Sequence, residues 1–191
     1  MVKAMLACYA KPHPDELFYS VVARLRERLR FLSITAFLHA VGGRGDALAS
    51  IDLPSYLDHF VSMLPARASL TTDDIIAKHT LLPFYVPFLS SGRVGEIKRR
   101  MRGGSRKGIQ LVLGYKHANV PKSHWLRYCP RCVAEDRERW GECYWHRIHQ
   151  VPGVEVCPDH AVWIQDSDAP ARDLRPCHEF RSAERTVTQC A

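Results

Sequence analysis

Cys129-Pro-Arg-Cys132, followed after 24 intervening residues by Cys157-Pro-Asp-His160, is the stretch of sequence that says most about the fold. A C-x-x-C pair and a C-x-x-H pair each place two ligands on one tight turn, which is the spacing that fills a tetrahedral Zn²⁺ site. Three thiolates and one imidazole leave no position for water, so the pattern predicts a structural zinc site. The alternatives are two unrelated buried cysteine turns or a disulfide.

The remaining cysteines argue against a disulfide framework. The chain has seven cysteines, and Cys8, Cys143, Cys177 and Cys190 follow no paired spacing. The sequence shows no signal-peptide pattern at its start and no apolar stretch that approaches the roughly 18 residues of a membrane span. We therefore expect a cytoplasmic protein without a membrane partner, in which thiols stay reduced and paired cysteines bind metal.

Length and charge narrow the class of protein. The 191 residues suit one domain or two small ones, and 46% hydrophobic residues suffice for a core. The formal net charge of +7 points to a polyanionic partner such as DNA. A solvated basic surface is the alternative explanation of this charge.

The first half of the chain has the pattern of short helices. Apolar residues recur at every fourth position from Leu17 to Leu29, after the helix-starting sequence Pro14-Asp-Glu16. Capping residues and apolar spacing predict further helices over residues 33–41, 55–63 and 71–81. Helices separated by short turns fit a helix-turn-helix fold, although any small helical bundle has the same pattern.

Two further segments precede the zinc pattern. Pro83 and Pro87 bracket residues 84–86, for which we expect an extended connector. The next segment is strongly basic, and a basic helix that runs into a glycine-rich loop can follow a phosphate backbone. The candidate DNA-binding residues are Lys98, Arg99, Arg100, Arg102, Arg106 and Lys107. A solvated helix face followed by a mobile linker is the alternative.

The sequence changes character near residue 108, which predicts three parts. These are a helical region with a basic tail over residues 1–108, a zinc-finger module over 109–165, and a disordered or truncated tail over 166–191. Ile109 to Leu113 is predicted to be a strand. Strands beside each metal turn, with a helix between the turns, resemble a zinc ribbon. The predicted fold class is therefore mainly α with a small zinc-binding β module, whose stability depends on the metal.

His146 and His149 lie between the two metal pairs and would share one face of a helix. We expect them to pack beside Trp145 and to hydrogen-bond to the backbone near the zinc module. Zinc ligation, a second metal site, general-base catalysis, and a surface that contacts phosphates or a partner protein are the alternatives.

Enzyme motifs are missing from the sequence. Nucleobase deaminases carry H-x-E upstream of P-C-x-x-C, and here Tyr128 stands where that proline would be. The metalloprotease pattern H-E-x-x-H and the phosphate-binding loop G-x-x-x-x-G-K-[ST] do not occur. We therefore predict that the chain is not an enzyme.

Several segments together resemble the TniQ/TnsD family, the target-selection proteins of Tn7-like transposons. The segments are Pro12-His-Pro-Asp-Glu-Leu17, the connector His79 to Phe88, and the run from Leu126 through Tyr144-Trp-His-Arg147 to His160. The last run is the most specific of the three, and the resemblance covers roughly residues 8 to 165.

The resemblance implies a helix-turn-helix region followed by zinc-finger modules, with Cys129, Cys132, Cys157 and His160 matching the metal ligands. It also implies a non-catalytic adaptor that recognises DNA, directly or through an RNA-guided complex, and recruits a TnsC-like AAA+ ATPase. The chain departs from the family in two ways. Family chains often carry a tryptophan near Ser20, which this chain lacks. They also usually continue for hundreds of residues, so we expect a short or truncated member. A generic zinc-containing helix-turn-helix DNA-binding regulator and a protein-interaction module are the alternatives.

Overall fold

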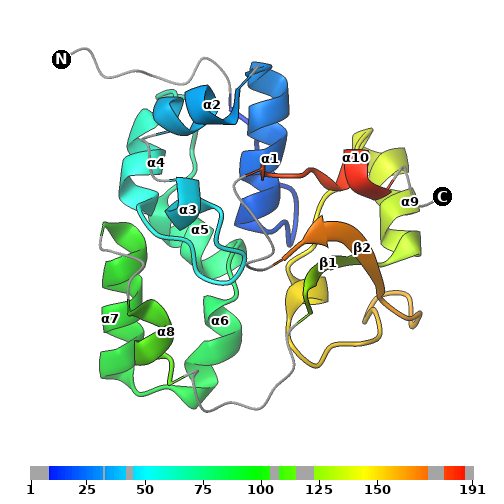
Figure 1. Cartoon of the computed structure of the whole chain (residues 1–191). Coiled ribbons are helices and arrows are strands. Elements are labelled where there is room, and N and C mark those ends of the chain that lie inside the picture. Colours follow the sequence, from blue (N-terminus) through cyan, green and yellow to red (C-terminus); the bar gives the residue numbers. More distant parts are fainter. Residues whose placement is uncertain are drawn as a thin grey trace.

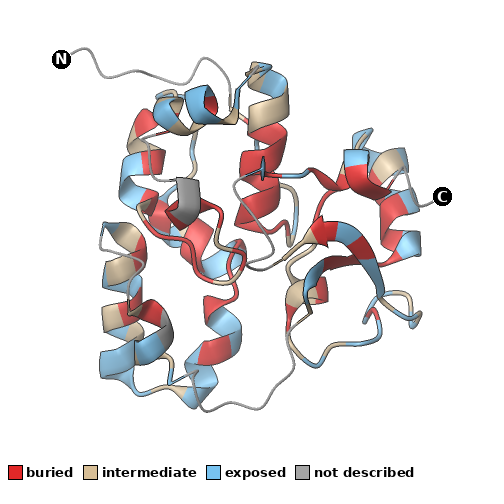
Figure 2. Cartoon of the chain, in the orientation of Figure 1, coloured by how far each residue is buried: buried red, intermediate tan, exposed pale blue. Residues whose placement is uncertain are grey.

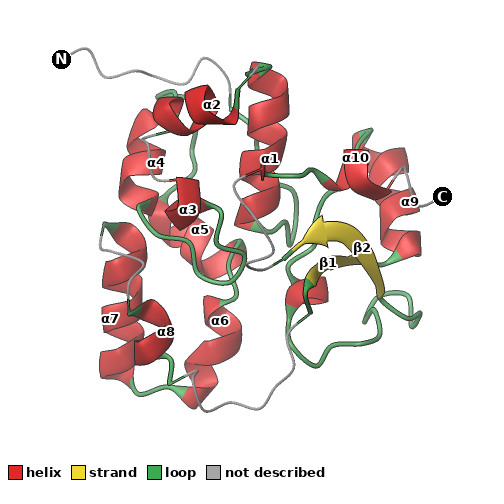
Figure 3. Cartoon of the chain, in the orientation of Figure 1, coloured by secondary structure: helices red, strands yellow, loops and turns green. Residues whose placement is uncertain are grey.

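A computed structural model of the chain shows a layer of helices beside a smaller unit that contains the two strands (Figure 1). The structure describes residues 9–31, 33–41, 45–103, 108–114, 123–171 and 179–187. The elements, with η for 3-10 helices, are α1 (Phe18–Leu29), α2 (Ile34–Ala40), α3 (Gly45–Leu48), α4 (Leu57–Met63), α5 (Thr72–Lys78), α6 (Leu82–Tyr85), η1 (Val86–Phe88), α7 (Ser91–Arg102), α8 (Ile109–Val112), β1 (Trp125–Tyr128), α9 (Pro130–Trp140), η3 (Ile148–Gln150), β2 (Gln165–Pro170) and α10 (Ala183–Val187). Helices predominate over strands, as Figure 3 shows.

Helix α1 is the centre of the helical region, as its apolar stripe predicts. Residues 18–25 are all buried, and the Phe18 ring packs edge-on against Phe60 of α4 with 5.1 Å between ring centroids. The last turns of α1 reach solvent and carry the basic residues. The helix ends at Arg30, which adopts the left-handed conformation (φ 50°) and donates its backbone N–H to the carbonyl of Glu27.

Helix α5 begins where its capping signal predicts. The Thr71 hydroxyl accepts a hydrogen bond from the Asp74 backbone N–H, and the Asp74 carboxylate accepts one from the Thr71 N–H, which is a capping box. The helix ends at Lys78, whereas the sequence pattern predicted an end near residue 81.

Two local predictions were wrong. The connector over residues 84–86 is not extended but belongs to the short helices α6 and η1. Pro83 and Pro87 each fall in the first turn of a helix, where the missing N–H has no intrahelical partner to lose. The run from Ile109 forms helix α8 instead of a strand, because Gly108 (φ 90°) starts a helical turn that buries Ile109 in the core.

The two strands form the only sheet in the described part of the chain. Strands β1 and β2 pair antiparallel, with Trp125 opposite Pro170 and Tyr128 opposite Gln165, and an irregularity lies between Trp125 and Arg127. Beyond residue 165, where we expected a tail, the chain forms β2 and later α10.

One hydrophobic core connects the helices to the smaller unit (Figure 2). It contains Leu17 and Phe60 from the helical region, Leu126 and Trp145 from the second unit, and Phe180 near the C-terminus. The predicted class, a mainly helical protein with a small Cys/His-containing β module, is confirmed. The shared core means that the second unit is supported by the helices as well as by its own contacts.

Candidate metal centre and its surroundings

The structure brings the four predicted ligands Cys129, Cys132, Cys157 and His160 together. Their ligand atoms lie within 4.8 Å of one another. The Cys132 Sγ lies 3.7 Å from the Cys157 Sγ and 3.3 Å from the His160 Nδ1. The sulfur–sulfur separation equals, and the sulfur–nitrogen separation lies slightly below, the roughly 3.5–3.8 Å edges of a tetrahedron built on zinc–sulfur bonds of about 2.3 Å and zinc–nitrogen bonds of about 2.0 Å. The four side chains can therefore hold a tetrahedral metal ion.

Local folding explains why each pair presents two ligands. Cys129 is the N-cap of α9, Pro130 is its first residue, and Cys132 lies in its first turn. The positive end of the helix dipole favours thiolates at this place. The second pair lies on a turn closed by hydrogen bonds from the Cys157 N–H to the Val162 carbonyl (2.8 Å) and from the Ala161 N–H to the Cys157 carbonyl (2.9 Å).

Two further side chains support the ligands. The His160 Nε2 lies 2.7 Å from the Glu135 Oε1, and because a carboxylate only accepts, this nitrogen donates and leaves Nδ1 for the metal. The His149 Nε2 lies 3.7 Å from the Cys132 Sγ. Burial lowers the pKa of His149 to about 3, so its neutral imidazole can donate an N–H to the thiolate.

His146 takes a different position from the backbone contacts that we expected. Its Nε2 lies 2.8 Å from the Asp136 Oδ2, and its ring stacks on Tyr144 with 4.4 Å between ring centroids. His146, His149 and Cys132 also lie within 4.8 Å of one another, but Cys132 belongs to both groups of potential ligands. We therefore place the two histidines around the candidate centre rather than in it.

The cluster is closed, which decides the chemistry it can perform. Cys129, Cys132 and Cys157 are buried, and the His160 side chain is only 7% exposed. Four protein ligands complete a tetrahedral shell without an open position for water or substrate. Such a centre stabilises structure.

The described cysteines, which include the separate Cys143, form no disulfide, and Cys8, Cys177 and Cys190 lie outside the described residues.

The sequence did not predict that two of its motifs meet. The segment over residues 12–17 packs against the segment over residues 144–147, and we call this contact the clasp. The Leu17 N–H donates to the Trp145 carbonyl (2.9 Å), and the Trp145 N–H donates to the Ser20 Oγ (3.1 Å). The clasp fixes the start of α1 to the chain that runs between the two metal pairs.

Asp15 and Arg147 complete the clasp. The Asp15 carboxylate accepts hydrogen bonds from the Arg147 Nε (2.9 Å) and the Ile148 backbone N–H (2.9 Å). The Arg147 guanidinium also donates to the Ala77 carbonyl of α5 (2.9 Å). Arg147 therefore connects its own segment to the start of α1 and to α5. In the sequence, the only sign of its importance was that it belongs to the tyrosine-tryptophan-histidine-arginine motif.

A buried ion cluster lies beside the clasp. Arg24, which is 2% exposed, pairs with Glu16 at 2.8 Å and with Glu142 at 2.6 Å, and Glu142 also pairs with Arg28 at 2.6 Å. Burial raises the pKa of Glu16, although the neighbouring guanidinium opposes this shift. Removing one member of such a cluster leaves an uncompensated buried charge, so the cluster fixes how α1 meets the second unit.

The predicted DNA-binding residues lie on α7 as far as the structure describes them. Lys98 and Arg99 are exposed, whereas Arg100 and Arg102 are half-buried; Arg106 and Lys107 lie outside the described residues. Glu96 pairs with Arg99 and with Arg100, each at 2.6 Å. Arg102 pairs with Asp58 of α4 (3.2 Å) and Asp73 of α5 (2.6 Å), so it also holds the helices together.

The helices are short. Within the described ranges, none of them combines the length and the apolar character that crossing a membrane requires.

Comparison with known proteins supports the family resemblance that the sequence motifs indicated. The profile of the TniQ family matches residues 8–163. Over 153 residues the chain is 32% identical to the transposon Tn7 transposition protein TnsD of Escherichia coli. This match covers 80% of the chain and 30% of that protein, so the chain spans less than a third of the length of this relative. The clasp and the candidate metal centre both lie within the matched residues. The chain belongs to the TniQ family.

Proposed function

We propose that this chain is a non-catalytic target-selection adaptor for Tn7-like transposition, which binds DNA and recruits a TnsC-like AAA+ ATPase. Its similarity to a Tn7 transposition protein over 80% of its length carries the proposal. In this function the four-ligand centre holds Zn²⁺ and has a structural role. The adaptor works in the cytoplasm, where thiols remain reduced and able to bind metal.

Helix α7 is the proposed DNA-binding surface. It carries Arg93, Lys98, Arg99, Arg100 and Arg102, against which Glu96 is its one acidic residue. The Arg99 side chain is 75% exposed, and no carboxylate of the described residues pairs with Lys98. Lys98 is available for phosphate contacts, and the exposed Arg99 can exchange its ion pair with Glu96 for a phosphate. Such contacts position a protein on DNA without reading its sequence. We extend the surface to Arg106 and Lys107, which follow in the chain.

The DNA-binding test replaces Lys98 and Arg99 together with alanine and leaves the structural Arg102 unchanged. Affinity for random-sequence duplex DNA, measured by fluorescence anisotropy over a series of salt concentrations, should fall. Because each phosphate contact contributes about 0.9 to the slope of log K against log salt, the slope should flatten by about 2. The matched control replaces Arg67 and Arg139, two exposed arginines outside α7, with alanine. An unchanged slope in the double variant would remove α7 from the DNA surface.

Recruitment is tested separately. The zinc-loaded chain, with its metal content quantified, is mixed with the TnsC-like ATPase from the same genetic locus in the presence and absence of DNA, and the complex is isolated. We expect the ATPase to be retained. DNA binding without ATPase binding would instead favour a generic zinc-containing DNA-binding regulator. Repeating the isolation with an RNA-guided complex from the same locus, where one exists, tells whether targeting passes through that complex.

A further inference from the structure

A pocket of about 550 Å³ opens at the clasp. Residues 11–15, which precede α1, form one wall, and residues 77–79 at the end of α5 form another. Trp140, the last residue of α9, and Arg147 complete the lining. All three segments that carry the family resemblance therefore contribute side chains to one opening. Neither a candidate metal ligand nor a residue of α7 is among its described lining residues.

The clasp holds the walls of this pocket in place. Asp15 and Arg147 pair at 2.9 Å, and the Arg147 guanidinium also donates to the Ala77 carbonyl at 2.9 Å. The indole of Trp140 lies against the His13 ring, with 4.8 Å between ring centroids. The pocket is thus largely preformed, and a ligand does not bear the cost of ordering it.

The pocket carries an uncompensated positive charge. Lys11, Lys78 and Arg147 line it, and Asp15, the one carboxylate among the described lining residues, is committed to Arg147. Lys78 pairs with Asp74 at 2.7 Å, but its side chain is 67% exposed, and such a surface pair contributes little. Lys11 is exposed and pairs with no carboxylate in the part of the chain that the structure describes. The pocket therefore attracts an anion, and Lys11 is its uncommitted cation.

A buried histidine offers a hydrogen-bond acceptor to the same pocket. His79 is 7% exposed, and its Nδ1 lies 2.7 Å from the Glu16 carbonyl oxygen, so Nδ1 carries the proton and donates. Burial lowers the pKa of His79, which keeps the ring neutral and leaves a lone pair on Nε2. No donor of the described residues reaches Nε2, and the atom is not sealed from solvent. A polar atom without a partner, on a buried side chain that lines a pocket, points to a donor on the ligand.

An aromatic ring completes the set of recognition groups. Trp140 remains 40% exposed, although tryptophan normally buries its large apolar surface. The Arg139 guanidinium lies 4.9 Å from the ring centroid and adds a further cation near the pocket. The exposed part of the indole, together with Pro12 and Pro14, gives the pocket an apolar side.

These groups together select a class of ligand. The phosphate groups of DNA supply negative charge, but they carry no hydrogen-bond donor for the His79 Nε2. A peptide segment with an acidic side chain supplies a carboxylate for Lys11, a backbone N–H for His79 and an apolar neighbour for Trp140. The observations therefore favour a protein ligand over DNA.

We infer that this pocket binds an aspartate- or glutamate-bearing segment of a partner protein. The carboxylate pairs with Lys11, a backbone N–H of the segment donates to the His79 Nε2, and a neighbouring apolar side chain packs on Trp140. This inference goes beyond the proposed function, because it holds for any partner with such a segment. It adds a protein-binding surface to the DNA-binding α7 of that function.

The test is an NMR titration of the ¹⁵N-labelled, zinc-loaded full chain at physiological salt. The probe is the blocked peptide acetyl-Leu-Glu-Gly-amide, and acetyl-Leu-Gln-Gly-amide, which has the same shape without the charge, is its matched control. We expect saturable shifts of the Trp140 indole and of the His79 ring nitrogens, with about fivefold weaker binding of the glutamine peptide. Equal affinity for both peptides, or no shifts with either, would overturn the inference.

A second peptide examines the acceptor. Methylation of every backbone nitrogen of the glutamate peptide removes the donors that could reach the His79 Nε2. The methylated peptide should bind more weakly and leave the His79 nitrogen resonances unshifted. Full affinity of the methylated peptide would contradict the inference.

Variants locate the binding energy. Lys11→Gln keeps the backbone carbonyl that accepts from Arg24 (3.3 Å), and it should weaken binding of the glutamate peptide about fivefold, the order of one exposed ion pair. Lys11→Arg retains the charge and should retain the affinity. Arg67→Gln removes one charge at an exposed position outside the pocket and should leave binding unchanged. Equal losses in Lys11→Gln and Arg67→Gln, or no loss in Lys11→Gln, count against the inference.

DNA is the alternative occupant of the pocket. A short random-sequence duplex is added to the peptide complex of the variant in which Lys98 and Arg99 are alanine, because its α7 surface is weakened. We expect the peptide to remain bound. Displacement of the peptide together with shifts of the Trp140 indole would overturn the inference and assign the pocket to phosphate groups.

The two proposals can fail independently. A wild-type chain that binds the glutamate peptide but does not retain the ATPase counts against the proposed function alone. A chain that retains the ATPase but gives no peptide shifts counts against the pocket alone.

Discussion

Removing the metal from the candidate centre should unfold the segment from Val154 to Ile164. At about 1.5 kcal/mol per residue, ordering this segment costs roughly 16 kcal/mol. The partly buried Val162 and Ile164 pack against the cysteines, and they contribute about 2 kcal/mol. Backbone hydrogen bonds such as that from the Cys157 N–H to the Val162 carbonyl (2.8 Å) add about 3 kcal/mol. A structural zinc ion supplies about 10 kcal/mol or more. The side-chain packing, the hydrogen bonds and the metal together balance the cost, and without the metal the cost is not met.

Hydrogen–deuterium exchange on protein with and without bound zinc measures this directly. Without the metal, residues 154–164 should exchange fully at the earliest time point, while α1 keeps its protection because it is buried in the shared core. Cys129→Ser should behave like the chelated protein. Cys143→Ala, which removes a buried thiol outside the cluster, should keep one zinc per chain. Full protection of residues 154–164 in zinc-free protein would refute the reasoning.

Three smaller perturbations follow from single contacts. Glu135→Gln weakens the acceptor for the His160 Nε2–H and should lower zinc affinity about tenfold in a chelator competition; Glu138→Gln is its control. Asp15→Asn breaks the charged contact with Arg147 and should cost about 1 kcal/mol of unfolding free energy in urea, because the pair is partly exposed; an unchanged midpoint would mean that the clasp is held by its other bonds. Hydrogen bonds from Lys78 and then Thr71 lower the pKa of Asp74 from 3.8 to about 2, so its contribution to stability is present above pH 4 and is lost as the pH falls toward 2. Asp74→Asn should flatten that loss relative to the wild type in pH-dependent urea denaturation, and parallel curves would contradict it.

Local signals account for what could be predicted from the sequence. The stripe from Leu17 to Leu29 predicted α1, and the Thr71 cap predicted the start of α5, because periodicity and capping depend on residues within one or two turns. The prediction of a strand from Ile109 was wrong because local pattern alone was used. A run of five residues with four apolar side chains fits a strand or a buried helical turn equally well, and packing against α7 decided between them.

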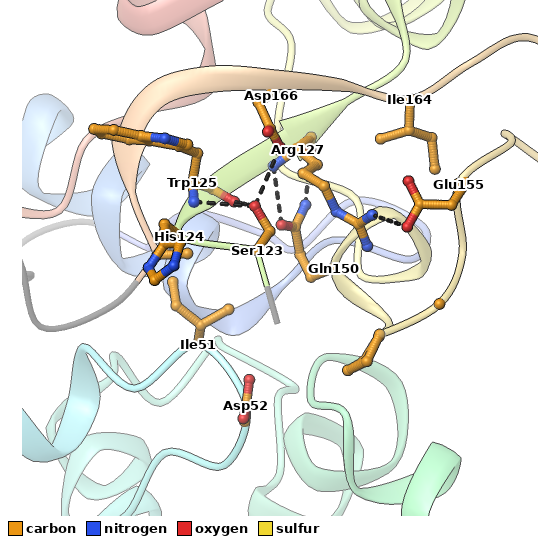
Figure 4. A pocket seen from close by; sticks show the side chains of 13 residues that line it. Ile51, Asp52, Ser123, His124, Trp125, Arg127, Gln150, Glu155, Ile164 and Asp166 are labelled. Atoms are coloured by element: carbon orange, nitrogen blue, oxygen red, sulfur yellow. Dashed lines mark hydrogen bonds and ion pairs between the residues drawn. The ribbon is translucent and has the colours of Figure 1, made fainter. Parts of the chain in front are cut away.

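Contacts between distant segments could not be predicted. Asp15 meets Arg147 at a separation of 132 residues, and Arg24 meets Glu142 at a separation of 118. Nothing in the spacing of either member indicates its partner, because the contact depends on the path of all the chain between them. The cleft between the helical region and the second unit (Figure 4) is of the same kind, since its walls come from residues 51–52 and from residues beyond 122.

By itself, the sequence determined which four side chains could share a metal ion, because Cys129 and Cys132 share one helical turn and Cys157 and His160 share another short turn. It also determined the helical character of the first half and the family to which the chain belongs. Only the tertiary structure decided that the two turns face each other, that the clasp joins α1 to the chain between them, and that the buried Arg24 pairs with Glu142. The physical reason is that turns and caps are local, whereas burial and charge pairing are set by the whole fold.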